Sequence, residues 1–150
     1  MSLVEIKEVK EDKKQYLSLL LLADEQENMI DSYIEKGTMY ILNDNGVKSE
    51  CIVTDEGFGI LEIKNIATVP THQGMGYGKA LISFIADHYK LKYDVLQVGT
   101  GDVPSTVGFY EACGFEYSHR LKNFFTDNYD HPIYEDGVQL VDMIYLKMKL

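Results

Sequence analysis

The spacing of apolar and polar residues predicts that the chain begins with a strand and two helices. Residues 3–9 alternate apolar and charged side chains, which is the pattern of a strand with one buried face. Apolar residues then recur at helical spacing, which predicts a helix from Asp12, its expected cap, to about residue 23. A second apolar stripe predicts a helix over residues 26–35, which Gly37 ends.

The next part of the chain has the pattern of strands joined by tight turns. Three strands are predicted here, over residues 38–42, 47–54 and 59–69. Asn45-Gly46 between the first two is a strong hairpin signal, and Glu56-Gly57 marks the following turn. Pro70 closes the third strand, because proline cannot donate to a strand ladder.

After Pro70 the pattern changes to alternating helices and strands. The predicted elements are a helix over residues 77–88, a strand over 95–98, a helix over 105–113 stopped by Gly114, and strands from 115 and over 138–150. The complete order is β-α-α-β-β-β-α-β-α-β-β. This order predicts a mixed sheet covered by helices, with one crossover connection near the middle.

Length and charge narrow the class of protein. The 150 residues suit a single domain spanning residues 1–150, and 45% hydrophobic residues suffice for a core. A net charge of -10 disfavours nucleic acid and anionic membranes as partners, but permits a cationic one. No apolar run reaches the roughly 18 residues of a membrane span, and residues 1–5 lack the pattern of a signal peptide.

The cysteines and histidines favour neither disulfide nor metal chemistry. Cys51 and Cys113 are the two cysteines, too few for a disulfide framework or a zinc site, and the four histidines do not cluster. We therefore expect a reduced, cytoplasmic protein without a bound metal.

A glycine-rich segment follows the third central strand and carries the clearest chemical signal. Glycines alternate at positions 74, 76 and 78, and an amphipathic helix begins directly after them. Exposed backbone amides and the positive end of the helix dipole make such a turn an anion site. A dinucleotide fingerprint would need glycine where Lys79 stands, and a phosphate-binding P-loop would need glycine at Gln73 and serine or threonine at Ala80.

What remains is the pattern Gln73-x-x-Gly76-x-Gly78, which resembles the GCN5-related N-acetyltransferase (GNAT) family. The segment at residues 108–115, Gly-Phe-Tyr-Glu-Ala-Cys-Gly-Phe, is similar to a second motif of that family and lies one helix and one strand further on. The resemblance implies the single-domain acyl-CoA N-acyltransferase fold. This is a mixed α/β fold with a mostly antiparallel sheet of about seven strands and about four flanking helices.

The resemblance also implies the reaction and the cofactor site. We expect direct transfer of an acetyl group from acetyl-CoA, used as a co-substrate, to a primary amine in a ternary complex. The loop amides would hold the pyrophosphate, and the end of the long strand would pair with pantetheine and offer an oxyanion donor. The expected cofactor-binding residues are Ala67, Thr68, Val69, Gln73, Gly74, Met75, Gly76, Tyr77, Gly78, Lys79 and Ser105. Where relatives carry an asparagine, Asp102 stands nearest, and Ser105 is expected to cap the helix instead.

Two residues are candidates for moving protons. The resemblance places Tyr110 near the sulfur, where its neutral phenol would protonate the leaving thiolate; the alternative is a core tyrosine satisfied by one hydrogen bond. Glu62 lies on the long strand, where several relatives place a general base. It shares a strand face with Lys64, however, so the alternative is a neutralised or solvent-facing charge.

Other functions stay open at this stage. The same fold could serve a silent acyl-CoA-binding module, or transfer a different acyl group. A homodimer is plausible, since the last predicted strand is rich in apolar residues. Residues 15–35 and 123–146 contain no lysine or arginine but five acids each, and in the resembled fold both border the acceptor site. This distribution indicates either solvated surface or steering of a cationic substrate.

Overall fold

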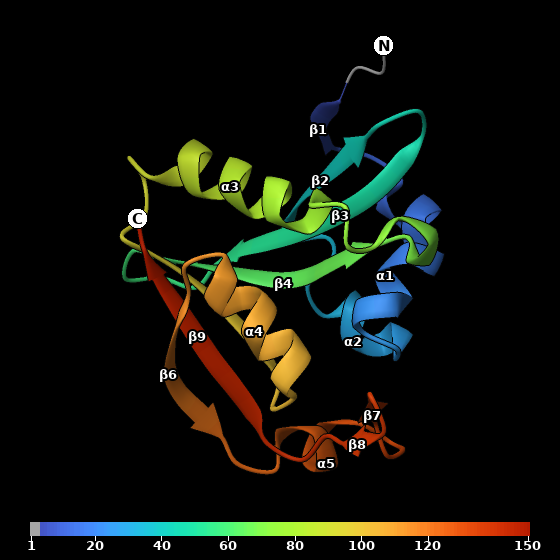
Figure 1. Cartoon of the computed structure of the whole chain (residues 1–150), viewed down its shortest axis with the longest axis vertical. Coiled ribbons are helices and arrows are strands. Elements are labelled where there is room, and N and C mark those ends of the chain that lie inside the picture. Colours follow the sequence, from blue (N-terminus) through green and yellow to red (C-terminus); the bar gives the residue numbers. More distant parts are fainter. Residues whose placement is uncertain (1–3) are drawn as a thin grey trace.

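A seven-stranded sheet in the order β1-β2-β3-β4-β5-β9-β6 runs through the centre of the structure (Figure 1). The computed structural model describes residues 4–150, so Leu3 of the first predicted strand lies outside the described residues. The strands are β1 (Glu5–Val9), β2 (Thr38–Asn43), β3 (Val47–Asp55), β4 (Ile60–Thr68), β5 (Val95–Gly101), β6 (Glu116–Leu121) and β9 (Met143–Lys149). Among the strands of the described residues, only β4 and β5 pair in parallel, across the predicted crossover.

Helices pack against both faces of this sheet. They are η1 (Lys13–Tyr16), α1 (Leu17–Ala23), α2 (Glu27–Asp31), η2 (Pro70–His72), α3 (Tyr77–Tyr89), α4 (Pro104–Ala112) and α5 (Phe124–Asn128). Successive side chains of β2 point to opposite faces of the sheet and pack against different helices, as the alternation along a strand requires. Ile41 packs in a cluster with Leu20 of α1, whereas Tyr40 packs with Leu81 of α3. Among the described residues, no helix is long and apolar enough to cross a membrane.

The first two helices differ from the prediction in length. Asp12 adopts a left-handed conformation and makes no side-chain capping bond, so its predicted role as a cap is wrong, and the segment begins as a 3₁₀ turn. The second helix is α2 alone, and the chain continues as turns to Gly37. The Ser32 hydroxyl donates to the Met29 carbonyl at the end of α2. Such side-chain bonds compete with helix propagation.

The last predicted strand is divided in two. Val138–Gln139 (β8) pairs with Tyr134–Glu135 (β7) in a separate hairpin, and only β9 joins the main sheet. The hairpin turns at Asp136-Gly137, where both residues have positive φ. Helix α5, which the pattern did not predict, packs Phe125 beside this hairpin in a small third cluster. Strand β9 lies between β5 and β6, and its Ile144 and Leu146 side chains pack in the core cluster that also contains Leu81 of α3.

Strands β4 and β5 separate halfway along their length, and this separation positions the site. Their register runs only from Ile60↔Val95 to Ile63↔Val98. The β3–β4 register also shifts next to Lys64, which marks a bulge that bends β4. The second half of β4 therefore has an unpaired edge facing the start of α4. The sequence did not reveal this separation.

Candidate active site

Two hollows meet in the gap between β4 and β5. One, the glycine-loop groove, has a volume of about 530 Å³ and runs along the end of β4 and the start of α3. The other, the acidic cavity, has a volume of about 290 Å³ and lies between α1, α5 and the β7–β8 hairpin. The two hollows share four lining residues, Leu22, Ile66, Thr106 and Tyr110. A molecule extending from one hollow to the other would pass these residues.

The end of β4 offers backbone groups to the groove. The Ala67 carbonyl accepts from Ser49 and the Val69 amide donates to Lys48, so both face β3. Because backbone groups alternate along a strand, those of Ile66 and Thr68 face the gap. Gln73 donates to the Thr68 carbonyl there, 3.2 Å away. Of the predicted strand residues, Ala67 and Thr68 line the groove, whereas Val69 does not.

The glycine loop forms the other wall of the groove. Gly74 and Gly76 have positive φ, which an L side chain adopts only with strain, and Gly76 precedes the first residue of α3. A Cβ on Gly78 would lie 3.1 Å from the Phe109 ring, so this glycine lets α3 and α4 approach closely. The predicted residues that line the groove here are Gln73, Gly74, Gly76, Tyr77, Gly78, Lys79 and Ser105. Met75, 60% exposed, is not among them.

Tyr110 lies where the two hollows meet. It is buried on α4, edge-on to the Phe109 and Phe115 rings. Burial, followed by nearby charges that include Glu135, raises the pKa of its phenol. Among the described residues, its hydroxyl has no hydrogen-bond partner. The phenol is therefore neutral near pH 7 and its proton is available to a bound molecule.

Glu62 lies outside both hollows. Its side chain is buried on β4, where one carboxylate oxygen accepts from Gln97 at 2.5 Å. The other oxygen pairs with the Lys64 ammonium at 2.7 Å. Lys64 is the residue that the sequence analysis named as a possible neutralising partner. Both oxygens are thus occupied, and Glu62 lines neither hollow.

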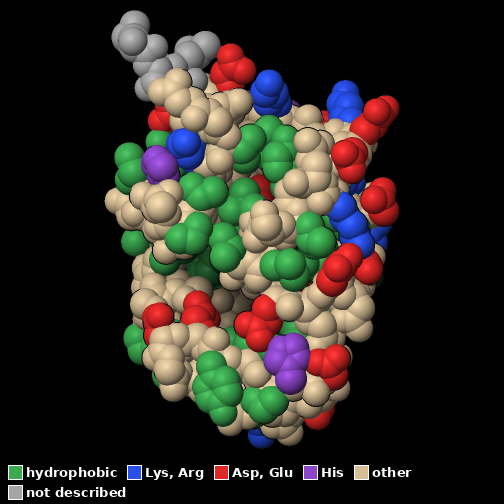
Figure 2. Space-filling view, turned by 90° about the vertical axis from the view of Figure 1, so that its right-hand side faces the viewer, with side chains coloured by type: hydrophobic (Ala, Val, Ile, Leu, Met, Phe, Trp, Pro, Cys, Tyr) green, Lys and Arg blue, Asp and Glu red, His purple; other side chains and the backbone are tan. Residues whose placement is uncertain are grey.

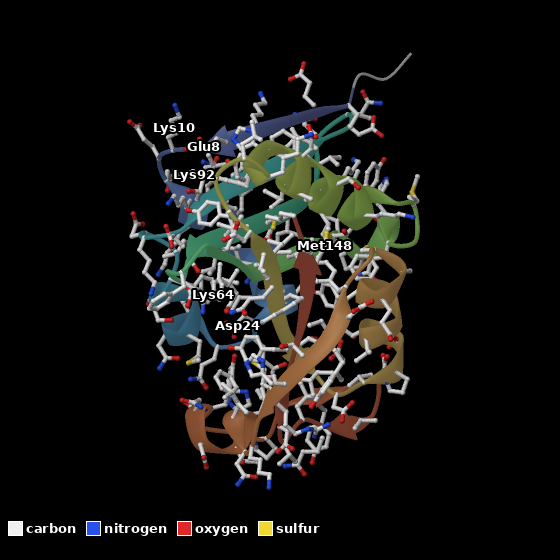
Figure 3. All side chains as sticks on the ribbon, turned by 90° about the vertical axis from the view of Figure 1, so that its left-hand side faces the viewer. Glu8, Lys10, Asp24, Lys64, Lys92 and Met148 are labelled. Atoms are coloured by element: carbon white, nitrogen blue, oxygen red, sulfur yellow. The ribbon has the colours of Figure 1, made fainter. Side chains whose placement is uncertain are left out.

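Asp24 is the most connected carboxylate of the acidic cavity. It accepts hydrogen bonds from the hydroxyls of Tyr33, at 3.0 Å, and Tyr129, at 2.7 Å. Asn65 of β4 in turn donates to the Tyr33 hydroxyl. Burial raises the pKa of Asp24, and the two hydroxyls counteract part of that rise. Figure 3 labels Asp24 and Lys64, both of which line the cavity.

Acidic residues from both ends of the chain surround this cavity. Its walls include Glu25 from the α1–α2 connection and Glu135 from β7. Figure 2 shows acidic side chains gathered around the hollowed lower part of this face. His131 pairs with Glu25 at 3.0 Å, and the Asp130 amide donates to Gln26, so the segments 24–26 and 129–131 are held together. We call this set of contacts the clasp.

One expectation about the start of α4 needs correction. Ser105 does not cap the helix, because Val103 is the residue at the cap position and makes no side-chain capping bond. Instead the Ser105 hydroxyl donates to Asp136 of the hairpin turn. Asp102 pairs with Arg120 and lines neither hollow. In residues 4–150, no group of three or more His, Cys, Asp or Glu side chains is placed to hold a metal ion.

The acid-rich segments 15–35 and 123–146 were expected to border the acceptor site, but the sequence did not show which of their acids meet there. Asp24, Tyr129 and Glu135 come together only in the fold, from three distant segments. One signal was available and was overlooked: Asp136-Gly137 is a typical hairpin dipeptide, and it would have placed Glu135 beside a tight turn.

Comparison with known proteins agrees with this architecture. A model of the acetyltransferase (GNAT) domain matches residues 35–117. YvbK, an uncharacterized N-acetyltransferase of Bacillus subtilis (strain 168), is 32% identical over 93% of this chain and 92% of its own. A GNAT family acetyltransferase from Elizabethkingia anophelis, solved with acetyl-CoA bound, superposes with a TM-score of 0.92 at 34% identity, covering 98% of each chain. A Bacillus subtilis acetyltransferase in complex with CoA gives 0.88 at 30% identity, covering 99% of each.

Fold and matches together define an acetyltransferase. The chain belongs to the GNAT family, as its two motifs predicted. The seven-stranded, mostly antiparallel sheet confirms the expected fold class, and α5 adds a helix to the four expected.

Proposed function

We propose that the protein transfers an acetyl group from acetyl-CoA to a small, positively charged primary amine, without a metal. The observation that carries this proposal is the meeting of two hollows of different character at Tyr110. The groove side ends in a glycine loop at a helix N-terminus, which suits a pyrophosphate. The other side is a cavity of about 290 Å³ with acidic walls, which suits a small cation.

In this proposal acetyl-CoA lies along the groove. The amides from Gly74 to Gly78 hold the pyrophosphate, assisted by Lys79. Pantetheine pairs with the unpaired edge of β4 at Thr68, while Ala67, whose carbonyl faces β3, only lines the groove. Two relatives at 34% and 30% identity were solved with acetyl-CoA or CoA, which supports this cofactor. The earlier expectation for Val69 and Met75 has less support, because neither lines the groove.

The reaction follows from the groups near the junction. The amine nitrogen attacks the thioester carbonyl, and the developing oxyanion accepts from a backbone amide of β4. Ile66 is the best placed donor for this role, since its amide faces the gap and its residue lines both hollows. The C–S bond then breaks, and Tyr110 donates its phenolic proton to the departing thiolate.

The decisive experiment is release of free thiol from acetyl-CoA with a panel of amines. Tyr110→Phe should lower kcat by about 10²–10⁴-fold, as expected for loss of a general acid, with little change in the Kd of acetyl-CoA. Glu62→Gln, measured beside it, tests the glutamate that sequence suggested as base. The contacts of Glu62 with Lys64 and Gln97 favour a structural role. Glu62→Gln should then lower the stability of the protein more than it lowers kcat.

The outcomes separate the alternatives. Binding of acetyl-CoA without turnover of any amine would favour a silent acyl-CoA-binding module. Faster turnover with propionyl- or succinyl-CoA would favour a different acyl group. Unchanged turnover of Tyr110→Phe would remove this residue from the mechanism.

The proposal also includes a cytoplasmic location and the possibility of a homodimer. Two free cysteines, Cys51 and Cys113, are consistent with the reducing cytoplasm. A homodimer through the final strand has less support than the sequence suggested, since β9 is an inner strand and β6 forms the edge.

A further inference from the structure

We propose that Glu135 of the β7–β8 hairpin is the general base that takes the proton of the acceptor amine. This inference rests on the proposed function and assigns the role of base to Glu135 in place of Glu62, the candidate that the sequence suggested. An amine with a pKa of about 10 is mostly protonated at pH 7, so a proton must leave before the nitrogen can attack. A carboxylate close to the reacting carbonyl is suited to accept it.

The position of Glu135 is set by Thr106. The Thr106 hydroxyl donates to one carboxylate oxygen of Glu135 at 2.6 Å. Thr106 lies one helical turn before Tyr110 on α4, and both residues line the two hollows at their junction. The charge of Glu135 also contributes, after burial, to the raised pKa of Tyr110. The carboxylate and the proposed acid therefore lie near the same reaction centre.

The start of α4 holds the whole hairpin in place. Beside the contact of Thr106 with Glu135, Ser105 donates to Asp136 at 2.5 Å. Two consecutive residues of the helix thus bond two consecutive residues of the hairpin. The tight turn at Asp136-Gly137 keeps the hairpin short, and this restricts Glu135 to the wall of the cavity.

The other carboxylates of the cavity are already engaged. Asp24 accepts two tyrosine hydroxyls, and Glu25 pairs with His131. On Glu135, by contrast, one oxygen bonds Thr106 and the second has no hydrogen-bond partner among the described residues. The titratable side chains that line the acidic cavity with it are Asp24, Glu25, Lys64, Tyr110, Tyr129 and Tyr134.

The proton balance of the step is complete. Glu135 accepts one proton from the ammonium group, and the freed lone pair forms the new N–C bond. The C–S electron pair stays on sulfur, which receives the proton of Tyr110. The nitrogen of the tetrahedral adduct still carries two protons, and one of them passes to solvent water as the amide forms. Solvent water also reprotonates the Tyr110 phenolate. Glu135 finally releases its proton to solvent.

The test compares kcat/KM of the wild type and Glu135→Gln between pH 7 and 9. Glutamine keeps an oxygen that can accept from Thr106, so the hairpin should stay docked. We expect a loss of roughly 10²-fold at pH 7, with unchanged Kd for acetyl-CoA. The loss should shrink by up to about tenfold per pH unit, because the fraction of unprotonated amine in solution rises with pH and this fraction needs no base. Thr106→Val should show a smaller loss with the same pH trend.

Glu111→Gln is the matched control. Glu111 is exposed on α4 next to Tyr110 and lines neither hollow, so this variant removes one negative charge nearby without touching the site. It should keep wild-type activity at every pH. A loss in Glu135→Gln that is the same at pH 7 and 9, or no loss at all, overturns the role of Glu135. If the wild type acetylates no amine, the proposed function itself fails, whatever the variant does.

Discussion

Glu50 is a carboxyl group placed where ionisation is unfavourable. Its side chain on β3 is 0% exposed, and neither carboxylate oxygen has a hydrogen-bond partner among residues 4–150. It pairs across the sheet with Ile41 and Ala67, on the face that α1 and α2 cover. An isolated charge in such a place is costly, and burial accordingly raises the pKa of Glu50 well above its ordinary value. Glu50 therefore holds its proton in the native protein.

A pH dependence of stability follows from this proton. The unfolded chain releases it near pH 4.3, whereas the native chain keeps it to higher pH, so the native state binds more protons in between. Stability should thus fall as pH rises, by up to about 1.4 kcal/mol per pH unit from this group. Urea unfolding between pH 5 and 8 should show a smaller fall for Glu50→Gln. Glu116→Gln, an exposed acid on β6, should keep the wild-type slope; equal slopes for all three proteins would contradict a protonated Glu50.

Among the elements, the junction of the glycine loop and α3 restricts the amino acid most strongly, because position 76 requires glycine. Gly76 combines φ of 86° with open space where a Cβ would project. Gly76→Val should cost about 1–2 kcal/mol of stability through backbone strain, and lower acetyl-CoA affinity at least about tenfold by filling the space in front of the amides. Isothermal titration measures the affinity.

The β3–β4 turn offers a matched control for that variant. Gly57 has φ of 83° and equally open surroundings, but lies away from the groove. Gly57→Val should lose similar stability and keep its affinity. Equal loss of affinity in both variants would mean that strain, and not the loop, is responsible.

The elements also show where sequence reasoning worked and where it stopped. Local signals succeeded: Asn45-Gly46 turns the β2–β3 hairpin, and the glycines at 74 and 76 adopt the left-handed conformations that the loop requires. The separation of β4 from β5 depends on pairing between strands more than thirty residues apart, which a local pattern does not contain. For the same reason the sequence left Asp24 and Glu135 as either solvated acids or charges that steer a cationic substrate, because their neighbours come from distant segments.

At the scale of the whole molecule, the acidic residues behind the net charge of -10 are unevenly distributed. The two acid-rich segments, residues 15–35 and 123–146, supply Asp24, Glu25 and Glu135 to the walls of the acidic cavity. The glycine-loop groove, in contrast, is lined by Lys79 and by no Asp or Glu. The charge distribution thus favours an anion on one side of Tyr110 and a cation on the other.

Steering by these acids predicts that kcat/KM for a cationic amine falls as salt rises. We expect a decrease of roughly threefold to tenfold between 50 and 500 mM NaCl, since salt screens exposed charges. The double variant Glu25→Gln with Asp130→Asn should flatten this dependence. Glu8→Gln with Glu11→Gln removes the same charge near β1 and should leave the slope unchanged. If kcat/KM of the wild type does not depend on salt, steering is contradicted and the acids serve only solubility.

The clasp has a consequence for how this enzyme could diversify. Tyr129 and Asp24 meet across 105 positions of sequence, and both lie outside residues 35–117, which match the family domain and contain the glycine loop and Tyr110. The segments that close the acidic cavity are therefore separate from the stretch that builds the groove. Mutations near the two ends of the chain that spare Glu135 can therefore reshape the entrance for the second substrate, while the stretch that holds the glycine loop and Tyr110 stays unchanged.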